Sequence, residues 1–478
     1  MAPPLLAHDL SDYTIHLTGV KGSGMAALAE LLHARGATLS GSDVADRFYT
    51  DEMLERIGLQ PRVGFAAQHL PQQLDLLLYS TAYAPDNPER SAARERGIPE
   101  LSYNEALGAL SRMQPTLAVS GVHGKTTTTA MIGTMARDLP VTVLVGSAVP
   151  SFDGSATLRG GNDLFVVEAC EYRRHFLSIQ PTVLLVTSIE ADHLDYFRDA
   201  QDVFAAFVQM ADQLPPQGCL VYCADDPGAR RLADRLRNDR PELRQIGYGF
   251  DNHADVRLSE PTTEAGLQHA SLRLSDGAVQ VALAVPGRHN LLNAAGALAA
   301  LDQIVAAAGA RPDRSAWAQR LRAFRGTRRR SEVLGEVDGV LVMDDYAHHP
   351  SAIRATLRGL REFYDRRILV DFMSHTYSRS AALLDDFAGA FGDAAMVVVN
   401  DIYASAREQT AAQIDSATFA QRLIDTHPDA HYRSDFGAAA RYLADAAQPG
   451  DVVLTMGAGD NFRIAERVLE LLQERSGA

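Results

Sequence analysis

A seven-residue run combines glycine, lysine and threonine in the order Gly121, Val122, His123, Gly124, Lys125, Thr126, Thr127. It follows a predicted buried strand at 116–120 and precedes a helical pattern, which disfavours a chance glycine-rich turn. Glycines let backbone amides approach phosphate oxygens, and a helix N-terminus adds a favourable dipole. Lys125 suits the β- and γ-phosphates of ATP, and the Thr126 hydroxyl suits Mg²⁺. The run therefore predicts an ATP-binding loop, although two residues instead of four separate its glycines.

Acidic side chains and a histidine follow two predicted strands. Glu168 follows the strand 164–167, and Glu190, Asp192 and His193 follow the strand 183–189. Mg²⁺ needs hard oxygen ligands beyond one hydroxyl, and the carboxyl ends of parallel strands meet at one sheet edge. We therefore expect these groups to converge beside the glycine run. The alternatives are helix-capping acids for Glu190 and Asp192, and a buried, hydrogen-bonded histidine for His193.

Polar side chains also open an alanine-rich helix predicted at 291–308. They are His289, Asn290 and Asn293. Asparagine amides offer paired donors and acceptors that suit an adenine edge. The residues alone place Asn290 at the N-cap of this helix, followed by a polar first turn.

Strands that alternate with helices organise the whole chain. The first block has strands at 13–18 and 75–80 and a helix at 25–34, a pattern typical of a parallel sheet covered by helices. The second block adds predicted antiparallel hairpins at 251–285, with a turn at Ser275-Asp276-Gly277. The third block has predicted strands at 340–343, 368–372, 396–399 and 452–456. We predict an α/β protein with three domains, at 1–112, 113–325 and 326–478.

Composition narrows the class of protein. A net charge of −15 disfavours a protein that coats nucleic acid. No apolar run reaches the ~20 residues that a membrane span needs, so membrane insertion is not expected. Three cysteines, at 170, 219 and 223, are too few for a disulfide framework and indicate a cytoplasmic protein. Lys21 and Lys125 are the only lysines of the chain, which makes Lys125 a candidate functional residue.

A glycine run at Gly19–Gly24 offers an alternative function. It ends a predicted strand, and Asp43 follows ~20 residues later, as in the fingerprint of nicotinamide-dependent oxidoreductases. That class leaves the run at 121–127 unexplained, so we treat it as a distant alternative.

Together these motifs resemble the Mur ligases of peptidoglycan synthesis, over nearly the whole chain. They run in the family's order, from the glycines at 19–24 to Met456-Gly457-Ala458-Gly459-Asp460. Three further segments are similar to the alanine-adding branch of the family. They are 344–350 (Asp-Asp-Tyr-Ala-His-His-Pro), 375–379 (His-Thr-Tyr-Ser-Arg) and 401–404 (Asp-Ile-Tyr-Ala).

The resemblance implies a Rossmann-like N-terminal domain for a UDP-sugar, a central P-loop ATPase domain and a Rossmann-like C-terminal domain. It implies that Lys125, Glu168, His193 and either Arg329 or Arg330 act on ATP and Mg²⁺, with Thr126, Glu168 and His193 at the metal. His289, Asn290 and Asn293 would contact adenine. The UDP-sugar would contact Gly19, Gly22, Gly24, Ser42, Asp43, Ser80 and Thr81. The muramoyl group and the amino acid would contact Tyr346, His348, His375, Arg379 and Arg407.

The implied reaction is the ATP-dependent ligation of L-alanine to the lactyl carboxylate of UDP-N-acetylmuramate, through an acyl phosphate. His348 and His375 are the candidate bases for the alanine amine. The alternatives within the family are a tripeptide-recycling ligase, another amino-acid-adding member and a catalytically silent sensor of the sugar nucleotide. The oligomeric state stays open.

Departures from the family pattern fall at the predicted site. They are Lys21 for glycine, Cys170, Tyr172 and Arg173 for Asp, Ser and Asp, and Ser188 for asparagine. Some Mur ligases hold a second Mg²⁺ with a carbamylated lysine. No lysine follows Lys125, so this chain cannot use that device.

Overall fold

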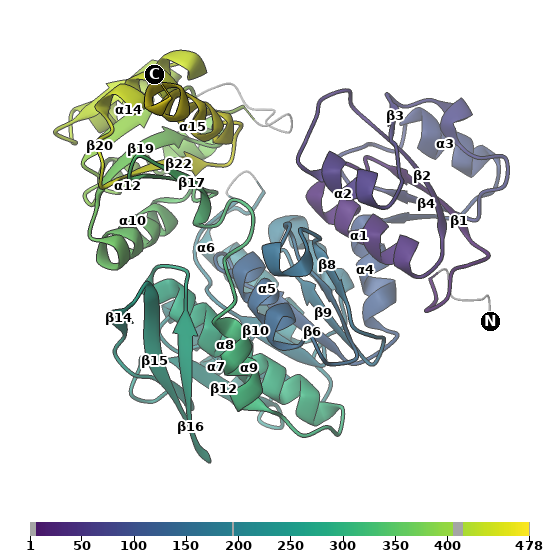
Figure 1. Cartoon of the computed structure of the whole chain (residues 1–478). Helices are drawn as coiled ribbons and strands as arrows, with labels where there is room; N and C mark the ends of the chain where they lie inside the picture. The colour runs from purple at the N-terminus through teal and green to yellow at the C-terminus, as the bar shows by residue number, and fades with distance from the viewer. Residues whose placement is uncertain (1–5, 194–195, 405–413, 478) are drawn as a thin grey trace.

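The computed structural model describes residues 6–193, 196–404 and 414–477. In these residues the strands form three separate sheets, one in each predicted domain region. Figure 1 shows the N-terminal body at the right, the C-terminal body at the upper left and the central body below them. The prediction of three α/β domains is confirmed, whereas the exact domain boundaries stay a prediction.

The N-terminal body contains a parallel five-stranded sheet in the order β3-β2-β1-β4-β5. Its strands are β1 (Thr14–Thr18), β2 (Thr38–Asp43), β3 (Arg62–Val63), β4 (Leu76–Tyr79) and β5 (Glu100–Ser102). Its helices are α1 (Ser23–Ala34), α2 (Thr50–Arg56), α3 (Pro88–Glu95) and α4 (Tyr103–Ser111). The strand, glycine turn and helix predicted at its start are therefore present.

The central body has a mostly parallel sheet whose middle strands are β11-β10-β6-β9-β7. These are β6 (Thr116–Ser120), β7 (Val141–Leu144), β9 (Leu164–Glu168), β10 (Val183–Val186) and β11 (Cys219–Cys223). Helix α5 (Lys125–Met135) follows β6, and α6 (Ala200–Ala211) and α7 (Pro227–Asp239) flank β11. Toward one edge β12 (Arg244–Gly249) and β13 (Val256–Leu258) lead into antiparallel strands. β8 (Thr157–Arg159) forms the other edge.

The predicted hairpins are confirmed. β14 (Thr262–Glu264), β15 (Leu267–Leu274) and β16 (Gly277–Leu283) pair antiparallel, and β15 and β16 meet at the predicted turn. α9 (Arg314–Leu321) packs nearby.

Helix α8 (Arg288–Ala307) lies in the core of the central body and begins earlier than predicted. By length and composition it could cross a membrane, but 83% of its most apolar window is buried in the fold. Placing Asn290 at the N-cap was wrong, because Gly287 caps the helix with φ +98°. Glycine adopts this conformation without a Cβ penalty, so the N-cap lies three residues before Asn290 and the helix begins at Arg288. The Asn290 side chain donates to Pro286 O instead, at 2.6 Å.

The C-terminal body has a six-stranded sheet in the order β17-β18-β22-β19-β20-β21. Its strands are β17 (Glu332–Val337), β18 (Val340–Asp345), β19 (Arg367–Met373), β20 (Met396–Val399), β21 (Ala430–Tyr432) and β22 (Asp451–Gly457). Its helices are α10 (Pro350–Tyr364), α11 (Tyr377–Ala382), α12 (Leu384–Ala388), α13 (Ser416–Ile424), α14 (Phe436–Ala446) and α15 (Phe462–Ser476). Only β17 is antiparallel to its neighbour, so the rest is the predicted parallel unit.

Candidate active site

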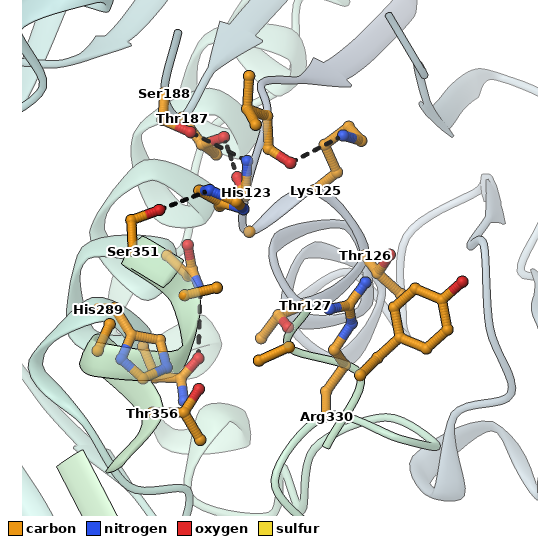
Figure 2. Close-up of a pocket in the computed structure, with 18 of the residues that line it drawn as sticks. His123, Lys125, Thr126, Thr127, Thr187, Ser188, His289, Arg330, Ser351 and Thr356 are labelled. Carbon is orange, nitrogen blue, oxygen red and sulfur yellow. Dashed lines mark hydrogen bonds between the residues drawn. The ribbon is translucent and has the colours of Figure 1, made fainter. Parts of the chain in front are cut away.

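A cavity of about 570 Å³ lies between the central and C-terminal bodies. The glycine run, the segments after β9 and β10, and the start of α8 line it from the central body. The segment before α10, the first turns of α10, and α11 line it from the C-terminal body. Figure 2 shows His123 beside Ser351, to which a dashed line joins it, with Lys125, Thr126 and Thr127 farther to the right. Motifs that are up to hundreds of residues apart in the sequence therefore line the same cavity.

The glycine run forms a tight loop between β6 and α5. Gly121 and Gly124 have φ of +132° and +81°, conformations that favour glycine. A Cβ on Gly124 would lie 2.5 Å from Asn293 Oδ1, so this position has no room for a side chain. Thr187 donates to the carbonyl of His123, and the His123 amide donates to Ser188 Oγ at 3.0 Å. Ser188 thus supports the loop directly, at a position where the family commonly has asparagine.

Lys125 is held at the N-terminus of α5. Its Nζ donates to Gly121 O at 2.5 Å, to Val122 O at 3.2 Å and to Glu171 Oε2 at 2.8 Å. Burial lowers the pKa of Lys125, but the acidic groups around it, Glu171 foremost, together outweigh burial, and the net shift is upward. Lys125 is therefore a permanent positive charge inside the loop. The contact with Glu171 was not predicted, and only the position of Glu171 three residues after Glu168 could have pointed to it.

The predicted metal ligands face one another. Thr126 Oγ1 donates to Glu168 Oε1 at 3.0 Å, and Glu168 Oε2 accepts from the Gly146 amide at 2.8 Å. His193 lines the same cavity in a left-handed conformation, φ +52°, with Nε2 3.5 Å from Glu171 Oε1. A hydroxyl, a carboxylate and an imidazole beside a lysine-bearing loop fit a Mg²⁺–phosphate group. Their roles as ligands stay a prediction.

The helix-capping alternative for Glu190 and Asp192 does not hold. The next helix, α6, begins at Ala200 and is capped by Asp199. Glu190 instead contacts His123, and Asp192 Oδ1 accepts from Arg379 at 2.6 Å. Glu190 also accepts from Ser351 at 2.9 Å, so both acids connect the central body to the C-terminal body.

The predicted adenine contacts sit together at the start of α8. Asn293 Nδ2 donates to Asn290 Oδ1 at 3.2 Å. His289 also lines the cavity, and burial lowers its pKa to about 4, so its ring is neutral at pH 7. Neutral aromatic and amide groups suit a nucleobase edge better than charged groups do.

Arg329 and Arg330 have different surroundings. Arg329 donates to Asp344, Gly459 O and Gly457 O at 2.8 to 2.9 Å, so its guanidinium is bound within the C-terminal body. Arg330 lines the cavity, with its guanidinium 4.9 Å from the Tyr346 ring centre. The geometry therefore favours Arg330 over Arg329 as the arginine that reaches a phosphate.

The segment before α10 carries Tyr346 and His348, which line the cavity together with His375 and Arg379. His348 Nδ1 lies 2.8 Å from Tyr346 O. Burial and the nearby Arg379 hold the pKa of His348 well below its usual range. Arg379 also donates to His375 Nδ1 at 3.1 Å. Arg407 lies outside the described residues.

The predicted UDP-sugar residues lie in the N-terminal body, apart from this cavity. Asp43 Oδ2 accepts from the Lys21 amide at 2.7 Å, which ties the glycine turn to the end of β2. Ser42 is fully buried, and its hydroxyl donates to Glu89, so its side chain faces the domain interior. Lys21 Nζ lies 3.0 Å from Asp51 Oδ1. Its charge is neutralised there. The remaining members of the predicted set are Gly19, Gly22, Gly24, Ser80 and Thr81.

Family models match this chain in three consecutive stretches. The Mur ligase family catalytic domain matches residues 14–114, and the Mur ligase middle domain matches residues 119–301. The Mur ligase glutamate ligase domain matches residues 329–459. The chain belongs to the Mur ligase family. The resemblance drawn from the motifs is confirmed, and the nicotinamide-dependent class is not favoured.

Relatives within the Mur ligase family match over almost their full length. The UDP-N-acetylmuramate–L-alanine ligase of Treponema pallidum (strain Nichols) is 45% identical, covering 98% of each chain. The ligase of the same name from Desulfitobacterium hafniense (strain Y51) is 39% identical, covering 95% of this chain and 99% of the relative.

Solved structures show the same three-domain fold. The UDP-N-acetylmuramate-alanine ligase MurC of Thermotoga maritima has a TM-score of 0.79 at 25% identity, covering 97% of this chain and all of that one. A murein peptide ligase of Psychrobacter arcticus has a TM-score of 0.68 at 22% identity, covering 96% of this chain and 98% of that one. The second match supports the fold alone.

Proposed function

We propose that this Mur ligase joins L-alanine to the lactyl carboxylate of UDP-N-acetylmuramate at the expense of ATP. The observation that carries the proposal is the shared cavity, in which the Lys125 loop faces His348 and Arg379. The names of the relatives in Treponema and Desulfitobacterium support the choice of sugar and amino acid. We place the reaction in the cytoplasm, in keeping with the sparse cysteines.

A carboxylate is a poor electrophile, so it must be activated before an amine can attack it. Transfer of the γ-phosphoryl group of ATP to the lactyl carboxylate gives an acyl phosphate and ADP. Lys125 and Arg330 would stabilise the negative charge that moves during this transfer. Bound Mg²⁺, held by Thr126, Glu168 and His193, would add positive charge at the same oxygens.

The alanine amine must be neutral to attack the acyl carbon. This attack forms the amide bond and releases phosphate. His348 is the better placed of the two candidate bases. Its Nδ1 faces the Tyr346 carbonyl and so carries the proton, which leaves the lone pair on Nε2. His375 accepts from Arg379 at Nδ1, so in the neutral ring the proton sits on Nε2. Burial keeps His348 neutral and able to accept a proton.

Arg379 is the proposed anchor for the alanine carboxylate. Its guanidinium already pairs with Asp192 at 2.6 Å, and both side chains are largely buried. Asp192 fixes one edge of the guanidinium, so that its other donors can hold a carboxylate in a defined orientation.

An acceptor panel tests the choice of amino acid. We expect kcat/KM to be highest for L-alanine, with UDP-N-acetylmuramate and ATP saturating. Glycine should react measurably but more slowly, because one methyl group is worth ~1–3 kcal/mol. Phosphate release measures each rate, and serine and the alanyl-glutamyl-diamino-acid tripeptide complete the panel. A preference for the tripeptide would identify a recycling ligase and refute the proposed acceptor.

A further inference from the structure

A hydroxyl at the start of α10 connects the C-terminal body to the ATP-binding loop. Ser351 Oγ lies 3.1 Å from His123 Nε2, 2.9 Å from Glu190 Oε1 and 2.7 Å from His349 Nδ1. His123 and Glu190 belong to the central body, and His349 and Ser351 to the C-terminal body. Figure 2 shows His123 pointing from the loop toward Ser351.

The three neighbours of Ser351 can be compared with the hydrogen bonds that one hydroxyl is able to make. A serine hydroxyl donates one hydrogen bond and accepts two. Glu190 can only accept, so the hydroxyl donates to it, while His123 Nε2 can donate to its oxygen. His349 Nδ1 lies 3.4 Å from the Ser351 amide, from which it accepts as the N-cap of α10, so it donates to the hydroxyl only in the tautomer that gives up this cap. His123 Nε2 also contacts Glu190 directly, which closes the cluster. Burial alone would raise the pKa of the Glu190 carboxyl. Its contacts, with His123 foremost, lower the pKa by more, so the net shift is downward.

A metal ion explains this cluster less well than hydrogen bonds do. The ligand atoms of His123, Glu190 and His349 lie within 4.8 Å of one another. Two ligands on one tetrahedral zinc ion would be roughly 3.3 Å apart, given metal–ligand distances of about 2 Å. His123 and Glu190 are instead in direct hydrogen-bond contact, and the Ser351 oxygen lies among all three side chains.

The cluster reaches the backbone that binds phosphate. The His123 peptide is held by Thr187 and Ser188, and the next residue, Gly124, is the left-handed N-cap of α5. A shift of the His123 side chain therefore acts on a loop with little freedom. The segment 190–193 makes a second bridge between the bodies, the Asp192–Arg379 pair.

We propose that Ser351 is a positioning residue that couples docking of the C-terminal body to the geometry of the ATP-binding loop. Through His123 and Glu190, Ser351 fixes the position of the C-terminal side chains that bind the amino acid, relative to the phosphoryl group that is transferred. The proposal rests on the proposed function for the identity of the reaction.

Three variants test this coupling. Ser351→Ala removes the hydroxyl, Ser351→Thr retains it, and Ser315→Ala makes the same change at the exposed second residue of α9, as Ser351 is the second residue of α10. We expect Ser351→Ala to lower kcat about tenfold, the loss typical of one hydrogen bond to a charged group. The Kd for a non-hydrolysable ATP analogue should stay within about twofold, because Thr187, Ser188 and the glycines still shape the loop. Ser351→Thr should restore kcat, and Ser315→Ala should leave it unchanged.

Glu190→Gln gives a second probe, because this side chain is about one-third exposed and the change keeps its shape. It should also lower kcat without weakening nucleotide binding. An unchanged kcat in Ser351→Ala and Glu190→Gln would overturn the proposal, as would a joint loss of kcat, nucleotide affinity and Tm. Stoichiometric Zn²⁺ binding by the metal-free protein that disappears in Glu190→Gln would also overturn it, in favour of a metal site.

Small-angle X-ray scattering separates this proposal from the proposed function, since it needs no turnover. With the ATP analogue bound, Ser351→Ala should have a larger radius of gyration than the wild type and Ser315→Ala. If the wild type fails to ligate alanine but this difference is present, the coupling stands and the proposed reaction fails. If ligation is present and the radii are equal, the coupling fails.

Discussion

At the scale of single residues, His348 and His375 differ in their hydrogen bonds although their rings lie 5.7 Å apart. If His348 is the base, His348→Asn should lower kcat by ~10² or more, and His375→Asn should have a smaller effect. Burial and Arg379 hold the pKa of His348 well below 6.5, so its protonation occurs only at lower pH. We therefore expect a wild-type kcat–pH profile without an acidic limb near 6.5. A limb at 6.5 that disappears in His348→Asn would contradict this assignment.

The residues that can do chemistry could be predicted from the sequence. Which of their side chains are already engaged by other parts of the fold could not. The loop at 121–127 and the groups Glu168, Glu190, Asp192 and His193 were placed correctly at one sheet edge, because parallel strands end together. The choice between Arg329 and Arg330 depends on contacts with Asp344 and Gly459, which are distant in sequence. Likewise, the sequence shows that Lys21 replaces a glycine of the family pattern, and only the fold brings Asp51 to its charge.

At the scale of elements, the turn from β6 into α5 depends on Gly124. Gly124→Ala would force alanine into φ +81° and place its Cβ 2.5 Å from Asn293 Oδ1. The left-handed conformation costs ~1–2 kcal/mol for a residue with a Cβ, and the contact must also be relieved. We expect the Kd for ATP to rise at least about tenfold, measured by calorimetric titration. Gly392→Ala is the control, because a Cβ there meets nothing within 4 Å. Equal ATP affinity in Gly124→Ala and the wild type would contradict the placement of the phosphates.

Some of the buried strands were predicted to the residue. β6 and β20 begin and end as expected, since buried parallel strands are bounded by turn residues on both sides. The start of α8 was missed because no local pattern reveals the positive φ of Gly287. β10 ends at Val186, three residues early, because Thr187 and Ser188 turn to support the ATP-binding loop.

At the scale of the whole molecule, contacts between bodies could not be predicted. Ser351 and Glu190 are 161 residues apart, and Arg379 and Asp192 are 187 apart. Each pair depends on how two separately folded sheets pack. The order and class of the domains follow from the chain alone, whereas their docking does not.

The C-terminal body should make stability depend on pH. Asp371 on β19 is fully buried, and burial raises its pKa to about 7 although Asn400 and Asn461 donate to it. An unfolded aspartate titrates near ~3.9, so between these values only the folded state holds the proton. Stability therefore falls as pH rises, by ~1.4 kcal/mol per unit, and levels off above pH 7.

Urea unfolding of the C-terminal body at pH 5 and pH 8 measures this effect. From pH 5 to 8 the wild type should lose about 3 kcal/mol relative to Asp371→Asn, which cannot ionise. Asp386→Asn, at an exposed site, should follow the wild type. Parallel pH dependence in all three proteins would show that Asp371 titrates normally.

Transfer of an oxygen atom tests the proposed reaction most directly. UDP-N-acetylmuramate labelled with ¹⁸O in its lactyl carboxylate is incubated with ATP, Mg²⁺ and L-alanine, and the products are examined by mass spectrometry. An acyl phosphate requires one carboxylate oxygen to leave with phosphate. The account predicts alanylated UDP-N-acetylmuramate together with phosphate that carries one ¹⁸O. Alanylated product with unlabelled phosphate, or ATP hydrolysis without alanylated product, would contradict it.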